Sequence, residues 1–160
     1  MHSIWLAGAV HSTWLSGAEW VAVLRIGLGL WWLESFRHKN LEAWIKRQSG
    51  INWAGDIASK HKFAFVKKSF ETFVKPHPKA MTYTVLASEL ALGLGLTLGF
   101  LTPIALFASI ILNLIYFVLM IHDWAEQGQN SMMVLAAAVC LGTHSWQVWS
   151  IDHVIHIFGA

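Results

Sequence analysis

The chain has 160 residues and a formal net charge of +2; 56% of its residues are hydrophobic and only 12% are charged. An ordinary soluble protein carries about 25% charged residues, because its surface faces water. The composition therefore argues against a soluble domain and favours a membrane protein. The one cysteine, Cys140, excludes an intramolecular disulfide, a covalently attached CxxCH haem and a cysteine-ligated iron–sulfur cluster built from this chain.

Four segments are long and apolar enough to be predicted as membrane spans, each of which takes about 20 helical residues. In chain order they cover residues 19–36, 81–101, 104–121 and 131–149, preceded by an interfacial lead-in over residues 1–17. Pro103 separates the second from the third, and the short link predicts an antiparallel hairpin. We therefore expect an all-α membrane protein with a single domain over residues 1–160: a four-transmembrane-helix bundle with a long basic, partly amphipathic loop between helices 1 and 2.

The predicted loop over residues 37–79 holds ten of the 11 Lys and Arg residues and three acidic residues, a net charge of +7. The positive-inside rule places this loop in the cytoplasm, with both termini outside a cytoplasmic membrane. It carries no nucleic-acid-binding motif, so membrane lipid is the expected contact and nucleic acid is not.

Within this loop, Phe63, Val66, Phe70 and Phe73 recur at helical spacing up to Pro76, and residues 41–47 form a second amphipathic stretch. Such segments either lie flat on an anionic membrane surface or cap the end of the bundle. Eight of the ten tryptophans precede the first predicted span or lie near the span ends, which is typical of interfacial anchors.

Three polar side chains fall deep inside the predicted spans: Arg25 in the first, Glu89 in the second and Asn113 in the third. An ionisable group in a bilayer costs several kcal/mol and should face a partner inside the bundle. We predict that Arg25 and Glu89 pair and that Asn113 joins them in one polar layer. This layer either fixes the helix register or binds a polar head group such as a quinone, with Arg25 and Glu89 as catalytic residues.

Other polar residues suggest weaker hypotheses. Glu34 lies within one turn of Arg37 and His38, which predicts local pairing. His38 and His122 fall at inner helix ends, but solvated histidines are far commoner there than haem ligands. The cluster of His144, His153 and His156 lacks a metal-site signature, so we expect no metal. Cys140 lies among apolar residues and is interpreted as packing.

The order of these features resembles the DoxX/DoxD family of small membrane proteins. Arg25 followed by IGLGLWWLESFRHK, closing at Lys39, resembles the first-helix pattern, and Glu89 followed by LALGLGLTLGFLTPIAL resembles the second helix and hairpin. The sequence Ser150-Ile151-Asp152 resembles the closing motif of the family, with Ile151 where the family has leucine. The long basic segment is closer to the DoxD-like members.

The resemblance implies the membrane subunit of a quinone-linked oxidoreductase, in this family of the thiosulfate:quinone type, with quinone as the cofactor. Such a subunit acts with a second, DoxA-type subunit, so partner subunits in a membrane complex are expected. The alternative is a noncatalytic accessory or structural subunit of a larger respiratory or photosynthetic complex. That alternative is favoured by the lack of a redox-capable motif in the chain.

Overall fold

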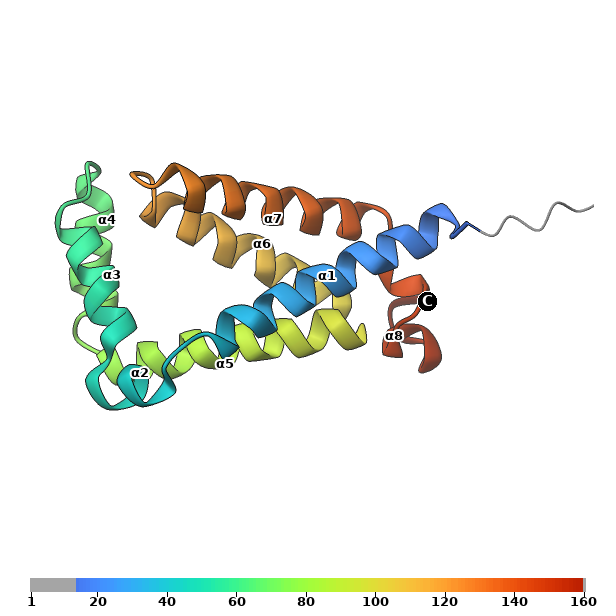
Figure 1. Cartoon of the computed structure of the whole chain (residues 1–160), viewed down its shortest axis with the longest axis horizontal. Helices are drawn as coiled ribbons and strands as arrows, with labels where there is room; N and C mark the ends of the chain where they lie inside the picture. The colour runs from blue at the N-terminus through green and yellow to red at the C-terminus, as the bar shows by residue number, and fades with distance from the viewer. Residues whose placement is uncertain (1–13, 160) are drawn as a thin grey trace, which may run out of the picture.

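The computed structural model describes residues 14–159, and within this range every regular element is a helix. The four long helices described are α1 (Gly17–Arg37), α5 (Pro78–Leu98), α6 (Thr102–Leu119) and α7 (Trp124–Gly142). They form two pairs, α1 with α5 and α6 with α7, which converge at the α5–α6 turn and separate toward the other end (Figure 1). Both α5 and α6 are long and apolar enough to cross a bilayer.

The starts of α1, α5 and α7 are encoded locally. Ser16 and Glu19 form a reciprocal capping box at the start of α1, and Asp123 accepts hydrogen bonds from two backbone N–H groups at the start of α7. Helix α5 begins at Pro78, where a missing N–H costs nothing. Helices α1 and α5 can approach closely because Gly29 and Gly93 have no side chain; a Cβ atom at either position would overlap the facing helix.

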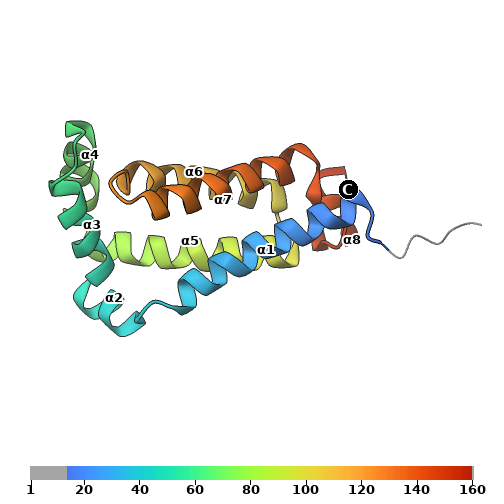
Figure 2. The same ribbon diagram turned by 45° about the horizontal axis from the view of Figure 1, so that its top comes forward.

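The segment expected as a loop is largely helical. It contains α2 (Leu41–Arg47), α3 (Ser49–Ser59), α4 (Ala64–Ser69) and the π-helix η1 (Phe70–Val74), here called the cap. The cap lies across the open end of the two helix pairs (Figures 1 and 2). The helical spacing predicted for residues 41–47 and 63–73 is therefore confirmed, whereas the description as a loop is wrong, because Asn40 caps α2 and short turns link the elements.

The cap is anchored by its inward face. Ile51, Ala58 and Val66 are buried, whereas Phe65 and Phe73 are exposed. The buried His61 ring bonds through Nε2 to the Val118 carbonyl on α6 at 2.9 Å, and its Nδ1 accepts the N–H of Phe63 at 3.1 Å. Of the two alternatives, the described packing is that of a cap over the bundle end; contact of its outer face with a membrane stays a prediction.

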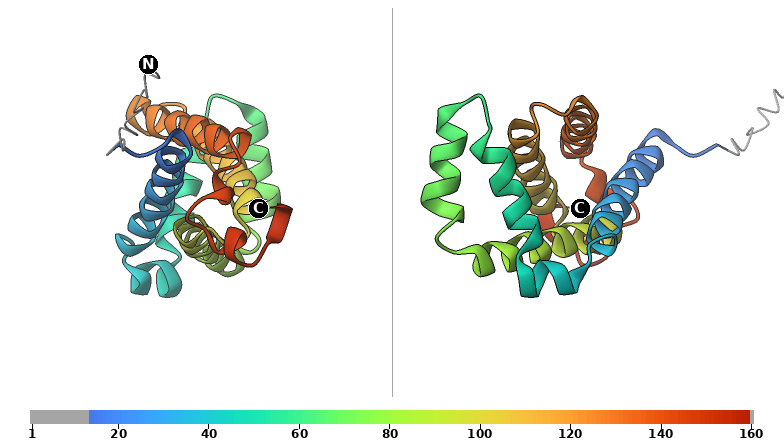
Figure 3. Two further views of the ribbon diagram at one scale, coloured as in Figure 1. Left: turned by 90° about the vertical axis from the view of Figure 1, so that its right-hand side faces the viewer. Right: turned by 60° about the vertical axis from the view of Figure 1, so that its left-hand side comes forward.

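At the opposite end the chain folds back in short helical pieces, η2 (Ser145–Gln147), α8 (Ile151–Val154) and η3 (Ile157–Gly159), which lie beside the α5–α6 turn (Figure 3). The fourth long helix therefore differs from the predicted span at 131–149. It begins at Trp124, because Asp123 caps it despite the polar sequence that follows, and it ends at Gly142, because His144 adopts the left-handed conformation. The predicted lead-in over residues 1–17 lies mostly outside the described residues.

Candidate functional site

Arg25 is fully buried on α1 and faces the C-terminal segment. Its Nη1 donates to the backbone carbonyls of Ser145 at 2.7 Å and Val148 at 3.3 Å, and its Nη2 donates to that of Trp149 at 2.5 Å. Carbonyl oxygens in the irregular segment after α7 lack the partners that a continuous helix would give them, and a guanidinium supplies several donors in one plane. Arg25 therefore holds the turn after α7 against α1.

Asp152, also fully buried, secures the same segment from the other side. Its carboxylate accepts the backbone N–H groups of Leu101 at 2.8 Å and Thr102 at 2.7 Å, at the start of α6, and its own N–H donates to the Gly99 carbonyl at 2.9 Å. Gly99 has φ +68°, and a side chain there would overlap Ser150. We call Arg25, Asp152 and their partners the C-terminal latch.

The predicted pairing of Arg25 with Glu89 is wrong. Within residues 14–159 no ion pair connects Arg25 to Glu89, and each of the two side chains has other partners. The physical reason is that the chain folds back after α7 and brings carbonyls to Arg25, which a pattern of helices alone does not reveal. Glu89 lies nearer the cap, where a different cation reaches it.

Lys39 is the partner of Glu89. It lies two residues beyond the end of α1, and its Nζ reaches Glu89 Oε2 on α5 at 2.5 Å. The Glu89 side chain is only 2% exposed and that of Lys39 13%. The ammonium also donates to the Ser35 carbonyl and hydroxyl at 3.0 and 3.1 Å, and the Tyr116 hydroxyl donates to Glu89 Oε1 at 3.3 Å. A buried carboxylate is thus charge-compensated and hydrogen-bonded, which it must be to persist in a low-dielectric interior.

This pair lines a cavity of about 300 Å³ under the cap, to which all four long helices contribute. Its walls carry four tryptophans, Trp31, Trp32, Trp44 and Trp53. The Trp44 ring lies 5.1 Å from the Lys39 ammonium, in cation–π geometry. Trp44 fits there because residue 50 is glycine: a side chain at Gly50 would overlap the indole. Trp31 of α1 and Trp53 of α3 are about half exposed, so the cavity reaches the molecular surface where these two residues line it.

Asn113 also lines the cavity, at 1% exposure. Its Nδ2 donates to the Ser109 carbonyl at 2.8 Å, and the Ser109 hydroxyl accepts the Trp32 indole N–H at 3.0 Å. Its buried Oδ1 has no partner among the described residues. Glu89 and Asn113 therefore line the same cavity, where Lys39 takes the place that was assigned to Arg25; a role of this site in binding or catalysis stays a prediction.

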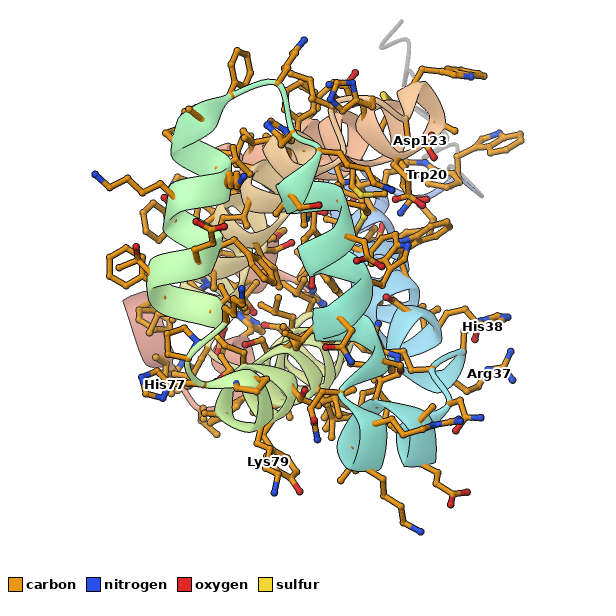
Figure 4. All side chains as sticks on the ribbon, turned by 90° about the vertical axis from the view of Figure 1, so that its left-hand side faces the viewer. Trp20, Arg37, His38, His77, Lys79 and Asp123 are labelled. Atoms are coloured by element: carbon orange, nitrogen blue, oxygen red, sulfur yellow. The ribbon has the colours of Figure 1, made fainter. Side chains whose placement is uncertain are left out.

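The remaining predicted residues are accounted for locally. Glu34 pairs with Arg37 at 2.6 Å and with His38 at 3.0 Å, as predicted, and Arg37 and His38 project from the bundle edge (Figure 4). The His61 and His122 rings lie 5.6 Å apart, and those of His153 and His156 6.5 Å apart. Cys140 is fully buried within the apolar core, as expected.

The sequence alone did not predict the contact of Lys39 with Glu89. It also did not predict three polar residues that line the cavity, Tyr116, Glu126 and Asn130. One signal was available on α7: Asn130, Met133, Ala137 and Cys140 are spaced by three or four residues and form its buried face. For Lys39, the sequence offered only the end of a motif, without the residue to which it binds.

The family model described as DoxX matches residues 20–123, from α1 to the turn before α7. The chain belongs to the DoxX family. The match includes Arg25, Lys39, Glu89 and Asn113 but ends before Asp152. Together with the two span-length apolar helices α5 and α6, it identifies a DoxX membrane protein. A comparison with the curated proteins and another with the solved structures found no match.

Proposed function

We propose that this DoxX protein is the membrane subunit of a quinone-linked oxidoreductase and that the Trp-lined cavity at Lys39 and Glu89 receives the quinone head group. The observation that carries the proposal is a buried, mutually compensated ion pair placed in the wall of an aromatic cavity. Cofactor pockets are mostly apolar and aromatic, with a few convergent polar groups and volumes of roughly 300–1,000 Å³. A cavity near the lower end of that range suits a single ring with its carbonyls.

The groups in the cavity suit the chemistry of a quinone. Reduction adds two electrons and two protons, so that each carbonyl becomes a hydroxyl. The Lys39 ammonium stabilises negative charge that develops on a carbonyl oxygen, and Glu89 exchanges a proton with it. The Lys39 ammonium donates to the Ser35 carbonyl, the Ser35 hydroxyl and Glu89. A quinone carbonyl therefore replaces the Ser35 hydroxyl as the acceptor of one N–H. The Asn113 Oδ1, which has no hydrogen-bond partner among residues 14–159, accepts the O–H of the quinol.

The electrons come from outside the chain, and in this family thiosulfate is the donor that the resemblance implies. Two thiosulfate ions lose one electron each and join as tetrathionate, while the quinone takes up both electrons and two protons. A second, DoxA-type subunit belongs to this reaction. Thiosulfate-dependent quinone reduction by membranes that contain both subunits is the corresponding assay.

We further propose that α1 and α7 also cross the bilayer, which makes a bundle of four spans. With 21 and 19 residues they are about 30 Å long, the thickness of a hydrocarbon core. The basic cap then lies on the cytoplasmic side of the cytoplasmic membrane, and the C-terminal latch and both chain ends lie outside.

Quinone binding is tested by quenching of tryptophan fluorescence in the purified protein with a short-chain quinone. We expect saturable quenching that Trp32→Phe reduces and that Trp124→Phe, a highly exposed residue outside the cavity, leaves unchanged. Glu89→Gln and Lys39→Met should weaken binding, whereas Glu71→Gln on the exposed face of the cap should not. Quenching that does not depend on Trp32, or that these variants do not alter, would contradict the proposal.

A noncatalytic accessory subunit is the second candidate. The observation that favours it is an apolar groove of about 900 Å³ between α5 and α6, lined by residues such as Ala91, Gly95, Ala105 and Ala108. Small side chains let another membrane helix approach closely. An accessory subunit should leave the membrane with large cofactor-bearing partners in mild detergent, which native mass spectrometry detects, and should not bind quinone alone.

A further inference from the structure

The cavity contains a second carboxylate, Glu126 of α7. Among its lining residues only Glu89 and Glu126 carry carboxylates. They differ sharply in their surroundings. Glu89 is almost fully buried and bonded to Lys39 and Tyr116, whereas Glu126 is half-buried, and its carboxylate forms no ion pair or hydrogen bond with any residue from 14 to 159. The cavity wall thus holds two carboxylates of different kinds: Glu89 is bonded to Lys39 and Tyr116, whereas Glu126 has no such partner within residues 14–159.

The position of Glu126 is set by the face of α7 that turns inward. Asn130, Met133, Ala137 and Cys140 are buried on that face, and Glu126 continues it by one turn toward the cap. The Asn130 side-chain amide donates through Nδ2 to the Glu126 backbone carbonyl at 2.7 Å, so its side-chain oxygen is not used in that bond. Gln129, exposed beside Glu126, also lines the cavity. Polar side chains thus run from the surface at Glu126 inward to Asn130.

Glu89 cannot exchange protons with bulk water directly, because only 2% of it is exposed. Its bonded neighbours offer no route to the surface that ends in a carboxylate: Lys39 is held by Ser35, and Tyr116 donates to Glu89 itself. Asp123, the nearest acidic residue in sequence to Glu126, caps the N-terminus of α7 and does not line the cavity. Glu126 is the carboxylate that lies both at the surface and in the cavity wall.

We propose that Glu126 is the proton-exchange group of the cavity, which passes protons between the aqueous phase on the cap side and the site at Glu89. This inference rests on the proposed quinone function. In the reductive direction the quinone gains two electrons from an external donor, and the two protons that complete the hydroxyls enter past Glu126. In the reverse direction a bound quinol loses two electrons to an acceptor and two protons leave by the same route.

The reverse direction gives a clean assay. The full chain in nanodiscs, loaded with one equivalent of a short-chain quinol, is mixed with ferricyanide in weakly buffered solution that contains a pH-indicator dye. Two ferricyanide ions accept one electron each and take up no proton, so the dye reports the two protons released per quinol. We expect Glu126→Gln to bind quinol as the unaltered protein does but to release protons at least about tenfold more slowly.

Two further measurements separate proton exchange from a structural effect. A small weak acid such as formate should restore the rate in Glu126→Gln, because it replaces the missing carrier, and Glu126→Asp should retain most of the rate. Glu71→Gln, an exposed carboxylate of the cap, serves as the matched control and should behave as the unaltered protein. Slow release that formate does not restore would overturn the inference.

The failures of the two proposals are distinguishable. If Glu126→Gln binds quinol and releases protons at the unaltered rate, protons leave elsewhere and the inference fails while the quinone site stands. If the unaltered protein binds no quinol, measured by tryptophan quenching, the proposed function fails and the inference falls with it.

Discussion

Lys39 reaches back past the end of α1 to place its ammonium 2.5 Å from the carboxylate of Glu89 on α5. The long apolar stem of lysine lets its charge lie well away from its backbone, so a residue in the connection to the cap becomes part of the bundle interior. This contact also ties the cap to the cavity, because the Trp44 ring of α2 lies over the same ammonium.

Removing one member of the Lys39–Glu89 pair leaves a buried charge without its partner. Lys39→Met and Glu89→Gln should each lower the free energy of unfolding, by about 3–5 kcal/mol for a fully buried pair and less in so far as water enters the cavity. The double variant should be more stable than the sum of the single losses predicts. Thermal unfolding of all four proteins in detergent measures this coupling; strictly additive losses would show that the pair does not interact.

Arg25 should prove structural. Arg25→Ala removes three charge-assisted hydrogen bonds to backbone carbonyls and should destabilise the protein by about 1.5–3 kcal/mol for each bond that water does not replace. Protease sensitivity should appear first in residues 143–159. Variants that still fold should bind quinone normally, because Arg25 does not line the cavity. Loss of quinone binding in a stably folded Arg25→Lys protein would argue for a direct role instead.

Gly99 should tolerate no side chain. Its positive φ and the overlap of a methyl group with Ser150 predict that Gly99→Ala lowers the melting temperature, with a cost of at least about 1 kcal/mol. Gly27→Ala is the matched control, because a methyl group there meets nothing within 4 Å and alanine favours a helix interior. Equal melting temperatures for the two variants would contradict the described turn.

Gly50 controls the position of Trp44. Gly50→Ala should push the indole off the Lys39 ammonium and into a different place in the cavity wall. We expect a shift of the tryptophan emission spectrum and weaker quinone quenching, with little change in global stability because the residue lies in the cap. Gly128→Ala, where a methyl group meets open space, provides the comparison. An unchanged spectrum in Gly50→Ala would mean that Trp44 does not depend on this glycine.

The proposed topology can be mapped with single cysteines, because the native Cys140 is buried. Lys68→Cys in the exposed part of the cap should react with an impermeant maleimide only from the cytoplasmic side, and Val154→Cys at the C-terminal end only from outside. Labelling of whole cells and of inverted vesicles distinguishes the two sides. Reaction of both positions from the same side would rule out the four-span arrangement.

The sequence by itself determined the helical membrane class, the positions of α1, α5 and α6, and the local ion pairs of Glu34. These depend on hydropathy over about 20 residues, on Pro103 between the second and third long helices, and on neighbours within one helical turn. The helical spacing at residues 63–73 belongs to the same class, because the period along the chain suffices to predict it.

Only the tertiary structure decided which partners the buried charges take. Arg25 and Glu89 carry opposite charges on neighbouring predicted spans, yet Arg25 binds carbonyls more than 100 residues away in the chain, and Glu89 binds Lys39, 50 residues away. Hydropathy does not encode where a chain folds back after its last helix or how far a lysine stem extends. The C-terminal latch and the cavity site therefore exist only once the helices are packed, because their polar groups are satisfied across elements rather than along them.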